Sequence, residues 1–131
     1  MVGISLLTLV PGEVGGAETY ARGLCRGLAR AGTLDYTAFT PPAAPGAGGG
    51  LREVQVPEYR AAHTIPQRLL AMGLAAAHPG AIRRRLGRLE AVHYPLAIAL
   101  PSLPDTPTVV TILDLQHLDH PELFGRAERL F

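Results

Sequence analysis

Hydrophobic and polar positions along this chain switch repeatedly between the period of a strand and that of a helix. An apolar run over residues 2–10 ends at Pro11-Gly12, which is typical of a strand buried on both faces. Over residues 18–31 the apolar positions share one helical face, and arginines recur every four residues on another. Glu18 and Arg22 add a favourable i,i+4 pair. A strand, a glycine loop and a helix in this order predict the start of a βαβ unit.

The rest of the chain continues this alternation. Residues 108–113 (TVVTIL) give the clearest strand pattern, because they are apolar and largely β-branched, and we expect them to be buried. Pro121 fits the first turn of a last helix. The other expected elements are strands at 34–40, 51–56 and 91–94, a helix after the N-cap Thr64, and a second helix after Pro79.

This alternation predicts an α/β fold, a Rossmann-like parallel sheet with helices on both faces. The 131 residues suffice for one domain with a real core. Residues 41–50 (PPAAPGAGGG) have the composition of a segment that buries little apolar surface, so we expect a flexible loop there. The lone Cys25 falls on the apolar helix face, which favours a buried structural thiol.

Composition places the chain among ordinary globular proteins. Apolar residues make up 47%, charged residues 18%, and the net charge is +1, so bulk electrostatics do not indicate a nucleic-acid binder. The first ten residues lack a positively charged signal-peptide region and are too short to span a bilayer. We therefore expect a cytoplasmic protein, with peripheral contact to the inner face of the membrane as an option. The arginines that could make this contact are Arg83, Arg84, Arg85 and Arg88, although such a run is more often a solvated helix face.

In a parallel sheet, ligands bind at the carboxyl ends of the strands, and three segments are expected there. The first is the loop of residues 12–16, whose glycines and helix N-terminus suit an anion such as phosphate. Its spacing is not G-x-G-x-x-G, and a simple tight turn is the commoner meaning of Gly15-Gly16. The absent fingerprint also weakens a nicotinamide or flavin oxidoreductase.

The other two segments carry imidazole and carboxylate groups. His93 and Tyr94 end one strand, and Asp114 and His117 follow the clearest strand. Asp114 could orient a substrate hydroxyl or an imidazole, or it could simply cap a turn. The His and Asp residues over 114–120 lack both cysteine and H-x-x-x-H spacing, so we expect no metal site.

Two stretches together resemble glycosyltransferase family 4. VGGAETYARGLCRGLARAG, residues 14–32, resembles the family's glycine loop and first helix, with its paired glycines, acidic residue, aromatic residue and spaced leucines. PTVVTILDLQHLDHPELF, residues 107–124, resembles a later strand followed by Asp, Leu-Gln-His and a Pro-Glu helix start. The motifs occur in the expected order and cover about a third of the chain.

The resemblance implies the amino-terminal, acceptor-side domain of a retaining GT-B enzyme, a glycosyltransferase of the hexosyl-transferase type. A nucleotide-sugar donor would be the co-substrate, no other cofactor or metal would be required, and the acceptor would be a carbohydrate, lipid or other small molecule. The amides of Gly15 and Gly16 would approach the donor diphosphate. By the same resemblance, His93 and Tyr94 would contact the acceptor, and Asp114 and His117 would take the catalytic positions.

Two departures from the family pattern limit this interpretation. Leu113 stands where the family has a His before the Asp. The chain also ends at Phe131, so we expect residues 1–131 to be a truncated domain that is inactive alone and lacks the donor half. The alternative is a non-catalytic Rossmann-like binding module.

Overall fold

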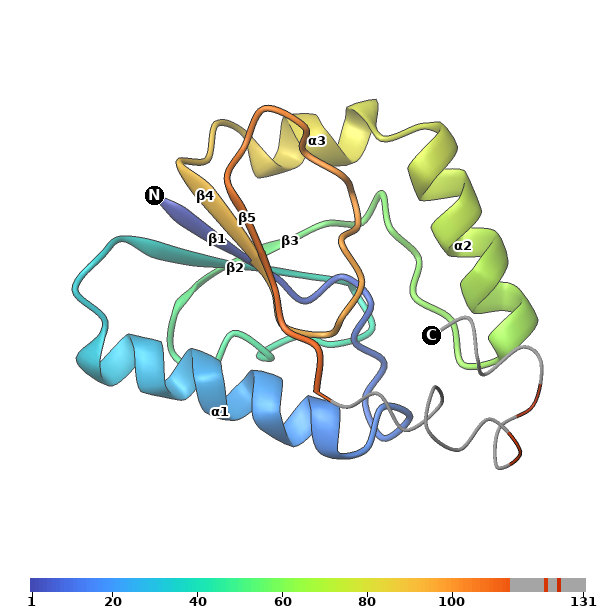
Figure 1. The fold of residues 1–131 in the computed structure, drawn as a ribbon, viewed down its shortest axis with the longest axis horizontal. Coiled ribbons are helices and arrows are strands. Elements are labelled where there is room, and N and C mark those ends of the chain that lie inside the picture. Colours follow the sequence, from blue (N-terminus) through green and yellow to red (C-terminus); the bar gives the residue numbers. More distant parts are fainter. Residues whose placement is uncertain (114–121, 123–124, 126–131) are drawn as a thin grey trace.

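The protein forms a five-stranded, fully parallel sheet in the order β3-β2-β1-β4-β5 (Figure 1). This computed structural model describes residues 1–113, 122 and 125. The elements in chain order are β1 (Val2–Ser5), α1 (Gly16–Ala31), β2 (Tyr36–Thr40), β3 (Arg52–Gln55), α2 (Ile65–Ala77), α3 (Gly80–Leu86), β4 (Ala91–Tyr94) and β5 (Thr108–Val110). The parallel, Rossmann-like α/β fold predicted from the alternating pattern is confirmed.

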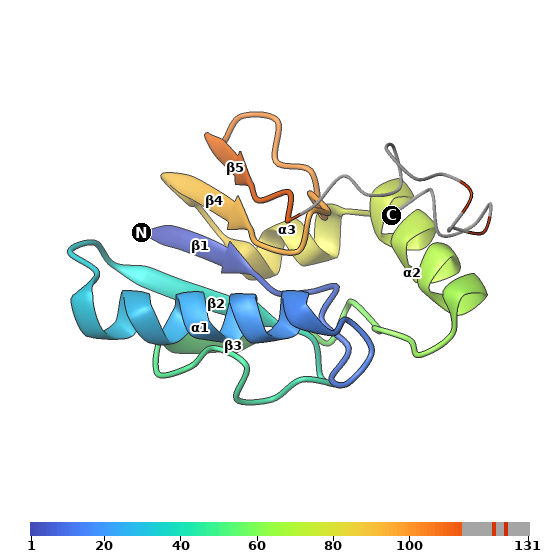
Figure 2. The same cartoon turned by 60° about the horizontal axis from the view of Figure 1, so that its bottom comes forward.

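Helices cover both faces of the sheet, α1 on one side and α3 on the other (Figures 1 and 2). Side chains of the strands alternate between the two faces of the sheet and pack into two separate cores. Ile4 of β1 packs with Ala21 and Cys25 of α1, whereas Phe39 of β2 packs with Ile82 of α3. Each layer therefore buries one face of the sheet, as the near-continuous apolar pattern of the strands requires.

Local predictions in the first half hold closely. The Glu18 carboxylate pairs with Arg22 Nε at 2.8 Å, and Cys25 is fully buried. Burial raises the pKa of the Cys25 thiol to about 11, so it is a protonated core group at neutral pH. The first strand is shorter than predicted and stops at Ser5. Residues 6–10 remain mostly buried but continue as turns, which explains why periodicity alone extended the strand.

The strand predicted over 108–113 is shorter and more exposed than expected, so the prediction is wrong in both length and burial. β5 has three residues, and its neighbours Ile112 and Leu113 are 63% and 44% exposed. Val109 within it is 57% exposed. β5 lies at the edge of the sheet and pairs only with β4 among the described strands, so its apolar side chains have few described neighbours. Sequence periodicity shows which positions are apolar, but it does not show whether a strand lies at the edge or in the centre of a sheet.

Segment 41–50 packs more closely than its composition suggested. Ala44 and Ala47 are buried in the α1-side core, and both lie in turns closed by backbone hydrogen bonds. The amides of Gly46 and Gly48 donate to the Glu53 carboxylate at 2.9 and 3.0 Å. The expectation that this segment buries little apolar surface is wrong, because small residues fill the space that a crossover helix would otherwise occupy. Its flexibility stays a prediction.

The two helices on the second face are separated where Pro79 predicted. Thr64 precedes α2 with Pro66 in its first turn, although the Thr64 hydroxyl makes no capping hydrogen bond. α2 ends at Ala77 and α3 begins at Gly80. No helix among the described residues is both long and apolar enough to cross a membrane.

Candidate functional site

The candidate site lies at the carboxyl edge of the sheet, beside β1 and β4. From β1 the chain continues through α1 to β2 on one side, whereas β4 lies on the other side of β1. This is the topological switch point of the sheet, where the connections diverge and leave a crevice. The glycine loop of residues 11–16 follows β1 and leads into α1 at this edge (Figure 2).

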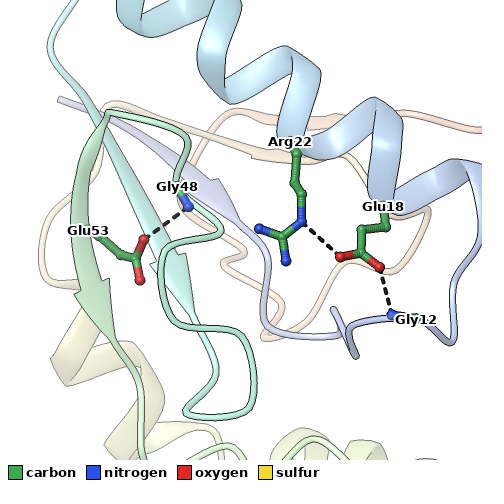
Figure 3. A network of polar contacts seen from close by, with 5 residues as sticks. All are labelled: Gly12, Glu18, Arg22, Gly48 and Glu53. Atoms are coloured by element: carbon green, nitrogen blue, oxygen red, sulfur yellow. Dashed lines mark hydrogen bonds and ion pairs between the residues drawn. The ribbon is translucent and has the colours of Figure 1, made fainter.

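One carboxylate closes the glycine loop. Glu18 accepts a hydrogen bond from the Gly12 amide at 2.8 Å and another from Arg22 Nε at 2.8 Å (Figure 3). The Gly12 amide first, and then Arg22, lower the pKa of the Glu18 carboxyl below its usual value. Gly12 and Gly15 have φ values of +79° and +52°, which explains glycine at both positions. The acidic residue of the resemblance motif thus holds the shape of the loop.

Glycine at position 16 has no such structural explanation. Its backbone does not lie in the left-handed region, and a Cβ built there would meet no heavy atom within 4 Å. Among the residues that the structure describes, the amides of Gly15 and Gly16 donate to no protein acceptor. Two free donors at the start of a 16-residue helix, next to open space, form a site suited to an anionic group.

A second polar group joins three elements at the same edge. His93 Nε2 lies 2.7 Å from the hydroxyl of Thr111, just after β5, and the Tyr20 hydroxyl of α1 lies 3.4 Å from that same oxygen. Burial lowers the pKa of His93, so its imidazole is neutral at pH 7. A neutral imidazole bonded to a hydroxyl can accept or pass on a proton from a bound alcohol.

Of the remaining predicted site residues, the structure describes Tyr94 and places it away from the crevice. Tyr94 is 1% exposed and donates its hydroxyl to the Pro101 carbonyl, and burial raises its pKa to about 12. We assign it a structural role, because its side chain faces the core instead of the crevice. Asp114 and His117 lie outside the described residues. Leu113, at the position of the family's His, is described and partly exposed.

The arginine cluster in and just after α3 is only partly available to contact a membrane surface. Arg83 donates from Nε and Nη2 to the Ser102 carbonyl, at 3.0 and 2.7 Å. Arg85 Nη2 lies 2.7 Å from the Glu58 carboxylate. These two guanidinium groups support local structure, and Arg84 and Arg88 are the exposed members left for an external contact.

Two of the hollows in the described part of the molecule are bordered by helix α2. The larger, about 490 Å³, is an open groove lined by α2, α3 and residues 58–62, and no residue of the glycine loop borders it. The smaller, about 150 Å³, is bordered by Val14 and Ala17 of the loop and helix α1. We place the candidate site at the smaller one, because Val14 and Ala17, which flank Gly15 and Gly16 in the chain, border it at the switch point.

Sequence reasoning missed three residues at this edge, namely Tyr20, Arg68 and Thr111. Tyr20 belongs to a predicted helix face and Thr111 to a predicted strand, and the two meet only where α1 packs beside the end of β5. Arg68 did carry a signal, since it is the one charged residue in α2 (IPQRLLAMGLAAA). Within residues 1–113, 122 and 125, no three His, Cys, Asp or Glu side chains converge as a metal site would require.

Comparison with known proteins adds no family assignment. No protein-family model, curated protein or solved structure matches the chain. The functional conclusion therefore depends on the geometry of this edge and on the sequence resemblance.

Proposed function

We propose that the chain is the acceptor-side domain of a retaining GT-B glycosyltransferase, which moves a sugar from a nucleotide-sugar donor to a carbohydrate, lipid or other small acceptor. The observation that carries this proposal is the pair of free amides at Gly15 and Gly16, with open space in front of Gly16 at the switch point. Neither packing nor backbone conformation requires glycine at position 16. A ligand that approaches the backbone closely would require it.

In the proposed reaction, these amides and the positive end of the α1 dipole stabilise the negative charge that develops on the departing diphosphate. A second α/β domain, outside these residues, would hold most of the nucleotide sugar. Because the Glu18 carboxylate already holds the loop at the Gly12 amide, little reorganisation of the loop would be needed when the charge appears. This stabilisation requires no metal.

The acceptor would lie on the β4 and β5 side of the loop. The neutral His93 imidazole and the Thr111 hydroxyl, which lie 2.7 Å apart, would hydrogen-bond an acceptor hydroxyl there. Asp114 and His117 stay predicted catalytic positions, and they follow Thr111 closely in the chain. Peripheral membrane contact would use Arg84 and Arg88.

A non-catalytic small-molecule-binding module is the second candidate. Leu113 favours it, because a leucine cannot exchange a proton with a reacting sugar at the position where the family has a His. Both candidates use the same crevice and differ in whether a glycosidic bond is made.

The test compares Gly16→Val with Gly27→Val in the protein expressed from its full reading frame. Both positions are in α1, and both have open space around a built Cβ, but Gly27 lies three turns from the loop. Nucleoside diphosphate release is measured over a panel of nucleotide sugars and acceptors. We expect Gly16→Val to reduce turnover on the order of 100-fold, since the valine occupies the space of the diphosphate, with Gly27→Val near wild type.

Equal turnover in the two variants would remove the phosphate role of the loop. No release with any donor, together with binding of a small ligand, would favour the non-catalytic module.

A further inference from the structure

A half-enclosed cavity of about 150 Å³ lies against the glycine loop. Its walls come from segments far apart in the sequence: Thr8 after β1, Val14 and Ala17 of the loop and α1, Tyr59 after β3, and Arg68 and Met72 of α2. Most of this lining is apolar. The polar residues among the described lining are Thr8, Tyr59 and Arg68.

The Arg68 guanidinium is only half satisfied within the protein. Its Nε donates to the Ala62 carbonyl at 3.0 Å, which fixes the direction of the side chain. Its Nη2 is buried and has no hydrogen-bond partner in the described part of the chain. Buried polar atoms in native proteins nearly always have a partner, so an orphaned donor on a charged group calls for an explanation.

No carboxylate of the described residues meets this charge. The ion pairs of the structure engage Glu13, Glu18, Glu58 and Glu90, each with another cation. None of the described residues that line the cavity is acidic. A half-buried guanidinium whose Nη2 has no partner in the described part of the chain can take its counter-ion from a ligand.

Tyr59 supplies a second polar group in the same wall. Its side chain is 3% exposed, and burial raises its pKa, so the phenol stays protonated at neutral pH. A protonated phenol can donate a hydrogen bond. Arg68 and Tyr59 therefore offer a cation and a hydroxyl donor to one guest, within walls that otherwise favour apolar contact.

We propose that this cavity binds the oxyanion group, a carboxylate or a phosphate, of a compact ligand, with Arg68 as its ion-pairing residue. The apolar walls accept a small hydrocarbon or ring portion of the same molecule. In the transferase this ligand is the acceptor, and that identification alone rests on the proposed function. The anion site itself does not depend on any reaction.

The experiment titrates the intact chain with three probes at constant ionic strength: benzoate, inorganic phosphate, and the neutral benzamide. Binding is followed by calorimetry and by the NMR signal of the Arg68 Nε–H group. Arg68→Met removes the charge at similar length, and Arg84→Met, an exposed arginine on α3, is the matched control. We expect saturable binding of one anion, at least tenfold weakened in Arg68→Met and unchanged in Arg84→Met.

Binding of benzoate supports the carboxylate form of the proposal, and binding of phosphate supports the phosphate form. The proposal is overturned if neither anion saturates, if benzamide binds as well as benzoate, or if Arg68→Met binds like wild type. Should Arg68→Met not fold, the Arg68 Nε–H signal of the wild type decides, since an unmoved signal on titration contradicts the site.

The two proposals fail separately. Anion binding at Arg68 without any diphosphate release would support this site and contradict the proposed transferase activity. Transfer whose acceptor KM is unchanged in Arg68→Met keeps the transferase and removes the acceptor from this cavity.

Discussion

Two glycine-rich segments, 11–16 and 41–50, each follow a strand, and each is held by one glutamate (Figure 3). The Glu18 carboxylate accepts a hydrogen bond from the Gly12 amide, and the Glu53 carboxylate accepts hydrogen bonds from the amides of Gly46 and Gly48. Their surroundings differ. A Cβ on Gly49 would lie 3.0 Å from the Arg26 backbone nitrogen, whereas one on Gly16 would meet nothing within 4 Å.

The difference separates glycines that the fold requires from one that it does not. Gly49 has a φ of +59° and touches helix α1, so both its conformation and its packing exclude a side chain. Gly16 has neither constraint and lies beside free amides. Two segments of similar composition thus have different roles. Residues 41–50 pack against α1 in the connection between β2 and β3, whereas residues 11–16 border an open site.

The largest expected effect comes from placing the same residue in both segments. Gly49→Val should lower the free energy of unfolding by about 3 kcal/mol, because valine is strained at positive φ and overlaps α1. Gly16→Val should change it by less than about 0.5 kcal/mol, since its side chain is open to solvent. Urea denaturation followed by circular dichroism measures both. Similar losses in the two variants would abolish the distinction.

An intermediate effect is expected at the glutamate of the packed segment. Glu53→Gln should lower the free energy of unfolding by about 1–2 kcal/mol, because the charged acceptor of two amides and the Thr40 hydroxyl is replaced by a neutral one. Hydrogen exchange at the Gly46 and Gly48 amides should speed up in parallel. Glu13→Gln, at an exposed position, serves as the control. Unchanged exchange would mean that turns alone hold the segment.

The smallest effect concerns the glutamate of the open loop and depends on pH. The pKa of the Glu18 carboxyl is lowered from 4.5 in the folded state, so its stabilisation is present above 4.5 and is lost as the pH falls through the folded pKa. The melting temperature of wild type should exceed that of Glu18→Gln at neutral pH, and the two should converge on acidification below 4.5. A gap that persists in acid would assign the effect to packing of the side chain instead of its charge.

Much of the fold could be predicted from short stretches of sequence, because the signals that define these elements come from neighbouring residues. The apolar stripe with Cys25, the Glu18–Arg22 pair and the break at Pro79 each depend on residues within a few turns. The burial of residues 108–113 was predicted wrongly, since β5 lies at the sheet edge and Val109 is exposed. Edge position depends on strand order, which no short pattern encodes.

For the candidate site, the sequence predicted roles for the glycine loop and His93, which stay predictions, and it did not indicate their neighbours. Thr111 comes within 2.7 Å of His93 through the parallel pairing of β4 and β5. Tyr94 adjoins His93 in the chain, yet alternate side chains of a strand face opposite sides, so it points into the core.

By itself, the sequence determined that strands and helices alternate, that the sheet is parallel, and where the glycine loop opens α1, because periodicity and helix-start signals act over a few residues. Only the tertiary structure decided which glycines are packed and which are open, and that Arg68 lines a cavity with one buried nitrogen that has no partner among the described residues. Those properties arise from contacts between segments tens of residues apart, and such contacts exist only after the sheet has assembled.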